Sequence, residues 1–267
     1  MNTPHSPRCE APDHSLTGGD NPCNAKGHDA DPVADLGLDV SRIRAITIDL
    51  DDTLWPIWPI IARAENALQA WLTQHAPATA ALCAAPGTLR ELRNQMNITR
   101  PDLAHDMSGL RRESIRLVLQ RAGDDPSLAE PAFEVFFAER HRVDLFDDAL
   151  PALEWLSRRY PVVAVSNGNA DVDRVGIGAH FTASLNAHGF GAPKPHPSIF
   201  LAAAQAAGVD ASQVLHVGDD AHLDGVGALN AGMQLAWVNR AGHAWEHAPL
   251  APHITVSELL ALCRALS

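Results

Sequence analysis

The apolar positions first gather in a short β-branched run at residues 43–50, which ends in a group of carboxylates. Such a run is typical of a buried parallel strand with charged residues beyond its carboxyl end. From 57 to 145 there is almost no strand pattern, and apolar residues recur at helical spacing over 60–72, 110–119 and 133–141. Turn signals rich in Gly, Pro and Asp separate these stretches. The pattern therefore predicts an all-helical insertion.

After residue 145, strand and helix patterns alternate. Strands are predicted at 162–166, 181–186, 214–217, 235–239 and 253–256, and helices at 197–207, 221–231 and 258–266. This alternation predicts an α/β fold, with a Rossmann-like parallel sheet core flanked by helices and an inserted all-helical cap domain. We expect a core formed by 41–56 and 146–267 and a cap formed by 57–145.

Residues 1–40 are rich in Pro, Gly, Asp, Asn and His and show no apolar period, which predicts a disordered tail. Two cysteines and two histidines in this tail could be drawn as a zinc site, namely Cys9, His14, Cys23 and His28. Their spacing matches no zinc-finger pattern, and the tail has little that could pack around a metal. Zinc binding is therefore disfavoured.

Composition narrows the classes of function. The net charge is -12, and no cluster of Lys or Arg is present, which disfavours nucleic-acid binding. No run of 18 apolar residues predicts a membrane span, and the first residues lack the pattern of a secretory signal. The cysteines form no CxxC pair, which favours a reduced protein. We expect a cytoplasmic monomer or homodimer.

Candidate chemistry follows the predicted strands, where ligands of open α/β sheets bind. The polar residues at these ends are Asp49, Asp51, Asp52 and Thr53 after the first strand, Ser166 and Asn167 after the second, Lys194 before a helix, and Asp219, Asp220 and Asp224 after a later strand. Several carboxylates at one site need a compensating cation, and oxygen ligands suit Mg²⁺. Lys194, one of two lysines in the chain, adds a compact positive charge. These parts suit phosphoryl transfer through an aspartyl-phosphate.

Four motifs in this order resemble the haloacid dehalogenase-like hydrolase superfamily: Asp49-Leu50-Asp51-Asp52-Thr53, Ser166, Lys194, and Gly218-Asp219 followed by Asp224. The resemblance implies a cap in the family's first position and a Mg²⁺ cofactor. It implies that Asp49 is the nucleophile, Asp51 the general acid and base, and Lys194 the group that offsets charge. Thr53, Ser166 and Asn167 would hold the loop and the phosphate. Asp49, the Asp51 carbonyl and Asp219 would ligate Mg²⁺, with Asp224 behind them.

Each motif taken alone has a structural explanation. Thr53 could be a turn residue or helix cap, and Ser166-Asn167-Gly168 an ordinary turn. Asp219 and Asp224 flank a helix start, where the dipole favours Asp. Asp52 is expected to be a solvated loop carboxylate. Asp49 is hardest to explain structurally, because a carboxylate that ends an apolar strand is costly to desolvate without a cation nearby.

The resemblance leaves several activities to weigh. A dehalogenase would need neither Asp51 nor the metal cluster, and phosphonate hydrolysis would need a cap lysine, which 57–145 lacks. A phosphomutase would share every core residue, and a non-catalytic phosphate-binding relative would have no need of Asp49. The favoured function is a phosphatase acting on a small phosphorylated metabolite. The pattern around Thr53-Leu54-Trp55 and Ser166 to Asp171 is similar to the branch that hydrolyses FMN or 5-amino-6-(5-phospho-D-ribitylamino)uracil.

The apolar segment Trp55-Pro56-Ile57-Trp58-Pro59 directly follows the first motif. Trp55 and Trp58 are most simply explained as residues that pack the cap, and the alternative hypothesis is that the segment is an apolar hinge that lines the substrate entrance.

Overall fold

The computed structural model describes residues 37–85, 87–103 and 105–267. The four residues of the disfavoured zinc site lie outside this range, as does most of the predicted tail.

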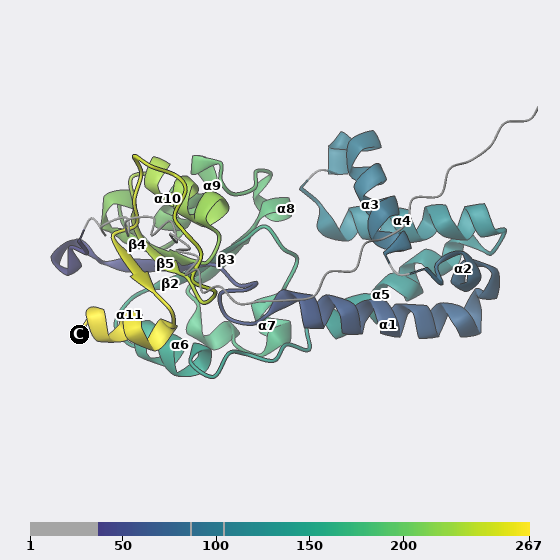
Figure 1. The fold of residues 1–267 in the computed structure, drawn as a ribbon, viewed down its shortest axis with the longest axis horizontal. Helices are drawn as coiled ribbons and strands as arrows, with labels where there is room; N and C mark the ends of the chain where they lie inside the picture. Colours follow the sequence, from purple (N-terminus) through teal and green to yellow (C-terminus); the bar gives the residue numbers. More distant parts are fainter. Residues whose placement is uncertain (1–36, 86, 104) are drawn as a thin grey trace, which may run out of the picture. The chain divides into compact units, whose positions relative to one another are not determined.

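Six parallel strands form one sheet (Figure 1). They are β1 (Ala45–Ile48), β2 (Val162–Ser166), β3 (Ala183–Asn186), β4 (Val214–Gly218), β5 (Gln234–Val238) and β6 (Ile254–Val256), in the order β3-β2-β1-β4-β5-β6. Every predicted strand is present, and the predicted parallel α/β core is confirmed. β1 lies in the middle of the sheet, so its carboxyl end faces the loops of both neighbouring strands.

The sheet is covered on both faces, as the figure shows. Ile46 and Ile48 of β1 belong to a core cluster with residues of α6 (Ala149–Ser157) and α11 (Leu259–Ala265). Ala45 belongs to a second cluster with residues of α9 (Pro197–Ala206) and α10 (Gly227–Asn230). Successive side chains of a strand point to opposite faces, so a strand buried on both faces reads as a continuous apolar run.

The segment between β1 and β2 is helical, as expected. It contains α1 (Ile57–His75), α2 (Pro77–Leu82), α3 (Thr88–Thr99), α4 (Met107–Ala122) and α5 (Ala129–Arg140). A separate apolar cluster joins α1, α4 and α5 through residues such as Leu68, Ile115 and Phe133. We call residues 57–140 the helical insertion; its action as a cap over the site stays a prediction.

Short helical turns complete the described part of the chain. They are η1 (Val40–Arg42), η2 (Pro101–Leu103), η3 (Pro126–Leu128), α7 (Val172–Val175), η4 (Gly178–His180), α8 (Ala187–Phe190), η5 (Ala211–Gln213) and the π-helical turn η6 (Ala221–Val226). The helix expected over 221–231 thus begins as a wide π turn and continues as α10. Among the described residues, no helix combines the length and the apolar character needed to cross a bilayer.

Candidate active site

Asp49 stands directly after β1, at the carboxyl edge of the sheet. Its backbone N–H donates to the Val217 carbonyl at 2.9 Å, so the ladder between β1 and β4 holds the residue in place. The side chain is buried, and its Oδ1 lies 2.5 Å from the ammonium of Lys194. The predicted nucleophile and the predicted charge-offsetting lysine are therefore in direct contact.

Lys194 bridges two carboxylates, because its Nζ also donates to Asp224 Oδ1 at 2.6 Å. Burial alone would lower the pKa of Lys194, but the adjoining carboxylates of Asp224 and Asp49 outweigh it and raise that pKa. The ammonium therefore stays charged at neutral pH.

A buried polar chain supports this lysine from behind. His216 of β4 is fully buried and contacts Asp224 Oδ1 at 3.1 Å and the Thr47 hydroxyl at 2.8 Å. Burial lowers the pKa of His216 and would raise that of Asp224, but Lys194 and His216 hold the pKa of Asp224 below its ordinary value. Asp224 Oδ2 accepts from the Asp220 N–H at 3.1 Å. Both oxygens of Asp224 thus have protein partners, which suits a residue that orients Lys194.

The π turn explains how Asp224 reaches that position. Gly225 N–H donates to the Asp220 carbonyl across five residues, and the Asp220 side chain caps the turn through the N–H groups of His222 and Leu223. Wide turns of this kind are frequent at functional sites. Asp220, to which the sequence assigns no role, therefore holds the turn that carries Asp224.

Asp219 completes the acidic group. Its Oδ1 accepts from the Thr53 hydroxyl at 2.9 Å, and its backbone carbonyl accepts from the Trp237 indole at 2.8 Å. Burial, followed by the charge of Asp224, raises the pKa of Asp219 to about 7. Thr53 itself is fully buried, so in this structure its hydroxyl orients a carboxylate; its predicted contact with phosphate stays a prediction.

The donor set fits a hard divalent cation. Carboxylate oxygens of Asp49, Asp219 and Asp224 lie within 4.8 Å of one another. Burial raises the pKa of Asp49 well above its ordinary value, although Lys194 pulls it down, so one lysine does not balance the cluster. An additional cation would restore the ionised carboxylates, and oxygen ligands are those Mg²⁺ prefers. The Asp51 carbonyl and Asp219 stay predicted ligands.

The loop after β2 supplies the neutral polar groups. Ser166 Oγ accepts from the Gly168 N–H at 2.9 Å. The Asn167 amide exchanges two hydrogen bonds with the Lys194 backbone, at 2.9 Å to its carbonyl and 2.7 Å from its N–H. Asn167 therefore holds the backbone of Lys194 at the end of β2. The sequence predicted only that Asn167 lies near the phosphate.

Asp51 has two partners that the sequence did not reveal. Arg140, the last residue of α5, is buried and places Nη2 2.7 Å from both carboxylate oxygens of Asp51. The Trp55 indole donates to Asp51 Oδ1 at 2.8 Å. Arg140 is the end of a helical pattern in the sequence, and nothing local marks it as a partner of a residue 89 positions earlier.

Asp52 differs from its expected form. It is half-buried, adopts a left-handed backbone with φ 60°, and accepts the Ile57 N–H at the start of α1 through Oδ1 at 2.9 Å. Burial raises its pKa. The carboxylate is thus bound by the backbone and is not simply solvated, because short polar side chains can stabilise a left-handed turn through local hydrogen bonds.

These side chains surround one cavity of about 170 Å³. Its walls include Asp49, Asp51, Ser166, Asn167, Gly168, Lys194, Asp219 and Asp224. The residues predicted from separate motifs thus share one cavity, with Thr53 just behind it. Trp55 is fully buried in the sheet core, Trp58 is exposed, and neither lines this cavity, so the hinge hypothesis for this segment stays a prediction.

Comparisons with known proteins place this geometry in a family. The 5-amino-6-(5-phospho-D-ribitylamino)uracil phosphatase of Escherichia coli is 32% identical over 231 residues, covering 84% of this chain and 96% of that protein. A phosphoserine phosphatase of Thermus thermophilus is 34% identical over 155 residues, covering 56% of this chain and 62% of its own. A crystal structure named as a 2-haloacid dehalogenase from Pseudomonas syringae has a TM-score of 0.77 and 39% identity, covering 84% of this chain and 98% of that one. The sequence model of the haloacid dehalogenase-like hydrolase family matches residues 43–232, well over half of this chain. The chain therefore belongs to the haloacid dehalogenase-like hydrolases.

Proposed function

We propose that this chain is a Mg²⁺-dependent phosphatase that hydrolyses the phosphate monoester of a small metabolite through an aspartyl-phosphate on Asp49. One observation carries the proposal: Asp49 and Asp51 line the same cavity as Ser166 and Lys194, beside the acidic cluster. A nucleophilic carboxylate and a second carboxyl group for proton transfer are what a two-step phosphoryl transfer requires.

In the first step, a carboxylate oxygen of Asp49 attacks phosphorus, and the bond to the ester oxygen breaks. Asp51 gives its proton to that leaving oxygen. In the second step, Asp51 takes a proton from water, the water oxygen attacks phosphorus, and the bond to Asp49 breaks to release inorganic phosphate. Both residues end in their starting protonation states.

The neighbouring groups stabilise the transferring phosphoryl group. The Lys194 ammonium, already 2.5 Å from Asp49, offsets the negative charge that gathers there. The Ser166 hydroxyl can donate to a phosphoryl oxygen while accepting from Gly168. A bound Mg²⁺ would supply charge neutralisation between phosphate and the carboxylates of Asp49 and Asp219.

For the substrate, we propose FMN or a ribityl phosphate. The phosphatase from Escherichia coli, similar over almost its whole length, is named for a phosphorylated ribitylamino compound, and this supports the choice. A phosphomutase remains the alternative, because it would use the same core residues and differ in retaining the leaving group.

A p-nitrophenyl phosphate assay with and without Mg²⁺ tests the proposal. We expect turnover that requires Mg²⁺ and falls at least about 10³-fold in Asp49→Asn, because the amide cannot act as the nucleophile. Asp144→Asn, an exposed carboxylate outside the site, is the control and should match wild type. Absence of Mg²⁺-dependent turnover, or equal turnover in Asp49→Asn, would refute the phosphatase function.

The similar structure named as a dehalogenase favours a second candidate reaction, attack of Asp49 on carbon. That reaction needs no proton donor at Asp51 and no metal. Chloride release from 2-chloropropionate separates the two: a dehalogenase would release chloride in the presence of EDTA, whereas the phosphatase would not.

A further inference from the structure

A second cavity of about 350 Å³ adjoins the candidate active site. Gly168 belongs to the walls of both cavities, so they meet at the loop after β2. A side chain at this position would place its Cβ 2.5 Å from Asp51 Oδ2, so only glycine fits here without displacing Asp51. A phosphate ester held beside Asp49 would therefore extend its leaving group past Gly168.

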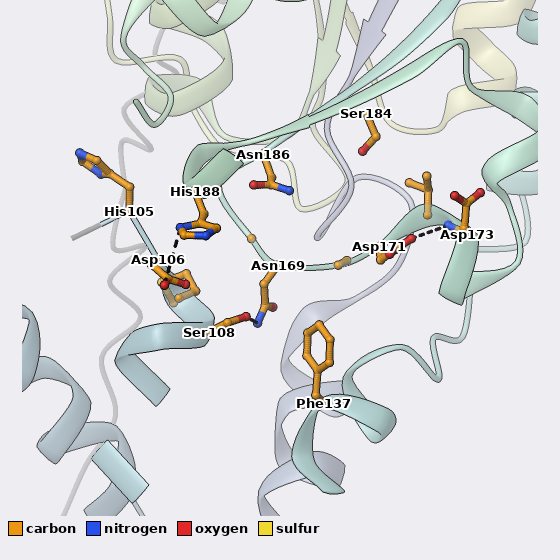
Figure 2. A pocket seen from close by; sticks show the side chains of 14 residues that line it. His105, Asp106, Ser108, Phe137, Asn169, Asp171, Asp173, Ser184, Asn186 and His188 are labelled. Atoms are coloured by element: carbon orange, nitrogen blue, oxygen red, sulfur yellow. Dashed lines mark hydrogen bonds and ion pairs between the residues drawn. The ribbon is translucent and has the colours of Figure 1, made fainter. Parts of the chain in front are cut away.

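The walls come from both the helical insertion and the core, as Figure 2 shows. The start of α4 contributes His105 to Ser108, whereas the core contributes the segment 168–173 and residues near the end of β3. The Asn169 amide nitrogen donates to the Ser108 hydroxyl at 3.1 Å across this junction. The cavity volume lies in the range of small-molecule sites.

Neutral hydrogen-bonding groups are available in this cavity. The bond between Asn169 and Ser108 leaves the Asn169 amide oxygen and the Ser108 hydroxyl hydrogen without a partner among the described residues. Asn186 uses its amide oxygen to accept from the Gly189 N–H, so its amide nitrogen is available as well. Paired donors and acceptors of this kind match hydroxyl groups, which both donate and accept.

The charge of the cavity is negative. Asp106, Asp171 and Asp173 line it, and of the described lining residues none is Lys or Arg. Two histidines also line the cavity, His105 and His188, and His188 Nδ1 lies 3.6 Å from Asp106 Oδ2. Arg174 lies over the Phe137 ring, 5.0 Å from its centroid, but does not line the cavity.

We propose, on the basis of the phosphatase function above, that this cavity receives the leaving group and selects uncharged polyhydroxylated phosphate esters. A substrate with a second anionic group, such as a carboxylate, is rejected there. The attraction comes from hydroxyl contacts to Asn169, Ser108 and Asn186, and the rejection from the carboxylates of Asp106 and Asp171. Discrimination of this kind relies on unfavourable charge contacts as much as on favourable ones.

Matched substrate pairs test the proposal. D-ribitol 5-phosphate and 5-phospho-D-ribonate differ in one terminal group, hydroxymethyl against carboxylate, as do glycerol 3-phosphate and 3-phosphoglycerate. We expect kcat/KM to be about tenfold or more higher for the uncharged member of each pair, since like charges repel across a partly desolvated cavity. Equal values, or preference for the carboxylated member, would overturn the proposal.

A double variant, Asp106→Asn with Asp171→Asn, tests which groups cause the rejection. Asp106 caps α4 through the Gly109 N–H, and Asp171 caps α7 through the N–H groups of Asp173 and Arg174. Asn caps helices about as well as Asp, so the change removes charge and retains the caps. We expect the preference for ribitol 5-phosphate over 5-phosphoribonate to fall about tenfold. An unchanged preference in a variant with wild-type circular dichroism would contradict the assignment.

Two controls distinguish failure of the cavity assignment from failure of the proposed phosphatase function. Asp125→Asn removes a capping carboxylate outside the cavity and should leave the preference unchanged. p-Nitrophenyl phosphate, whose leaving group carries neither hydroxyl groups nor a carboxylate, reports the phosphatase chemistry itself. No Mg²⁺-dependent hydrolysis of p-nitrophenyl phosphate would refute the proposed function, whereas hydrolysis without preference within the substrate pairs would refute the cavity assignment alone.

Discussion

At the scale of single residues, Lys194 shows how a buried charge is kept ionised. Its ammonium touches Asp49 and Asp224, and His216 and Thr47 continue the contacts into the sheet. A buried lysine without such partners would lose its proton. The same contacts hold the ammonium beside Asp49, the proposed nucleophile. The groups that keep Lys194 charged therefore also place it where the proposed reaction needs it.

Arg140 provides a test at this scale. Arg140→Lys removes Nη2, the single nitrogen that contacts both oxygens of Asp51, and the lysine side chain is one bond shorter, so its ammonium does not reach the same position. We expect kcat for p-nitrophenyl phosphate to fall about 10- to 100-fold with a small change in KM, because Asp51 loses its fixed orientation. Arg111→Lys, another buried arginine of the insertion, is the control and should retain kcat. Equal loss in both variants would show that burial, and not the contact with Asp51, is responsible.

The sequence could predict the residues of the site, because each follows a strand and parallel strands end at the same edge of a sheet. It could not predict Arg140 or His216 as their partners. The contact between Arg140 and Asp51 depends on how the insertion returns to the core, which no local pattern encodes. His216 occupies a buried strand position that looks like an ordinary core site, and only its contact with Asp224 reveals its role.

At the scale of elements, the start of α1 depends on Asp52. Its left-handed backbone and its bond to the Ile57 N–H turn the chain from the site into the insertion. Asp52→Ala removes the bond and retains an unfavourable conformation, so we expect the free energy of unfolding to fall by about 1–2 kcal/mol. Asp52→Asn, whose amide oxygen can accept the same bond and which tolerates this conformation, should stay within about 0.5 kcal/mol of wild type. Urea denaturation measures the unfolding free energy of both variants, and equal losses would argue against a stabilising role of the bond to Ile57.

Strands and long helices were predicted correctly, whereas some helices were not. α6 carries Pro151 in its first turn, where the missing N–H costs nothing, but a proline looks like a helix breaker in sequence. α2 and α3 flank the helix-breaking sequence Pro86-Gly87. The apolar spacing of α3 is weak, and Leu92 is its one buried residue. Tertiary packing against α4 supplies what local propensity does not.

At the scale of the whole molecule, metal binding should stabilise the fold. A ligand that binds only the folded protein contributes about 2.7 kcal/mol at a concentration 100-fold above its Kd. We therefore expect Mg²⁺ to raise Tm by about 5–10 °C and EDTA to reverse the shift. Asp219→Asn should abolish the shift, because a predicted ligand is lost, while Asp144→Asn should retain it. A full shift in Asp219→Asn would exclude Asp219 from the metal site.

The central place of β1 also bears on the order in which the chain folds. Ile46 pairs with Val162 and Ala45 with Val214, so β1, which precedes the proposed nucleophile Asp49, is synthesised long before either partner strand. The apolar cluster of the helical insertion, by contrast, joins helices between α1 and α5, all of which are synthesised before β2 and β4. During synthesis the insertion can therefore fold at a stage when the backbone groups of β1 still lack their partners in β2 and β4. The edge of the sheet that carries the candidate active site is thus completed only after β4 has been synthesised.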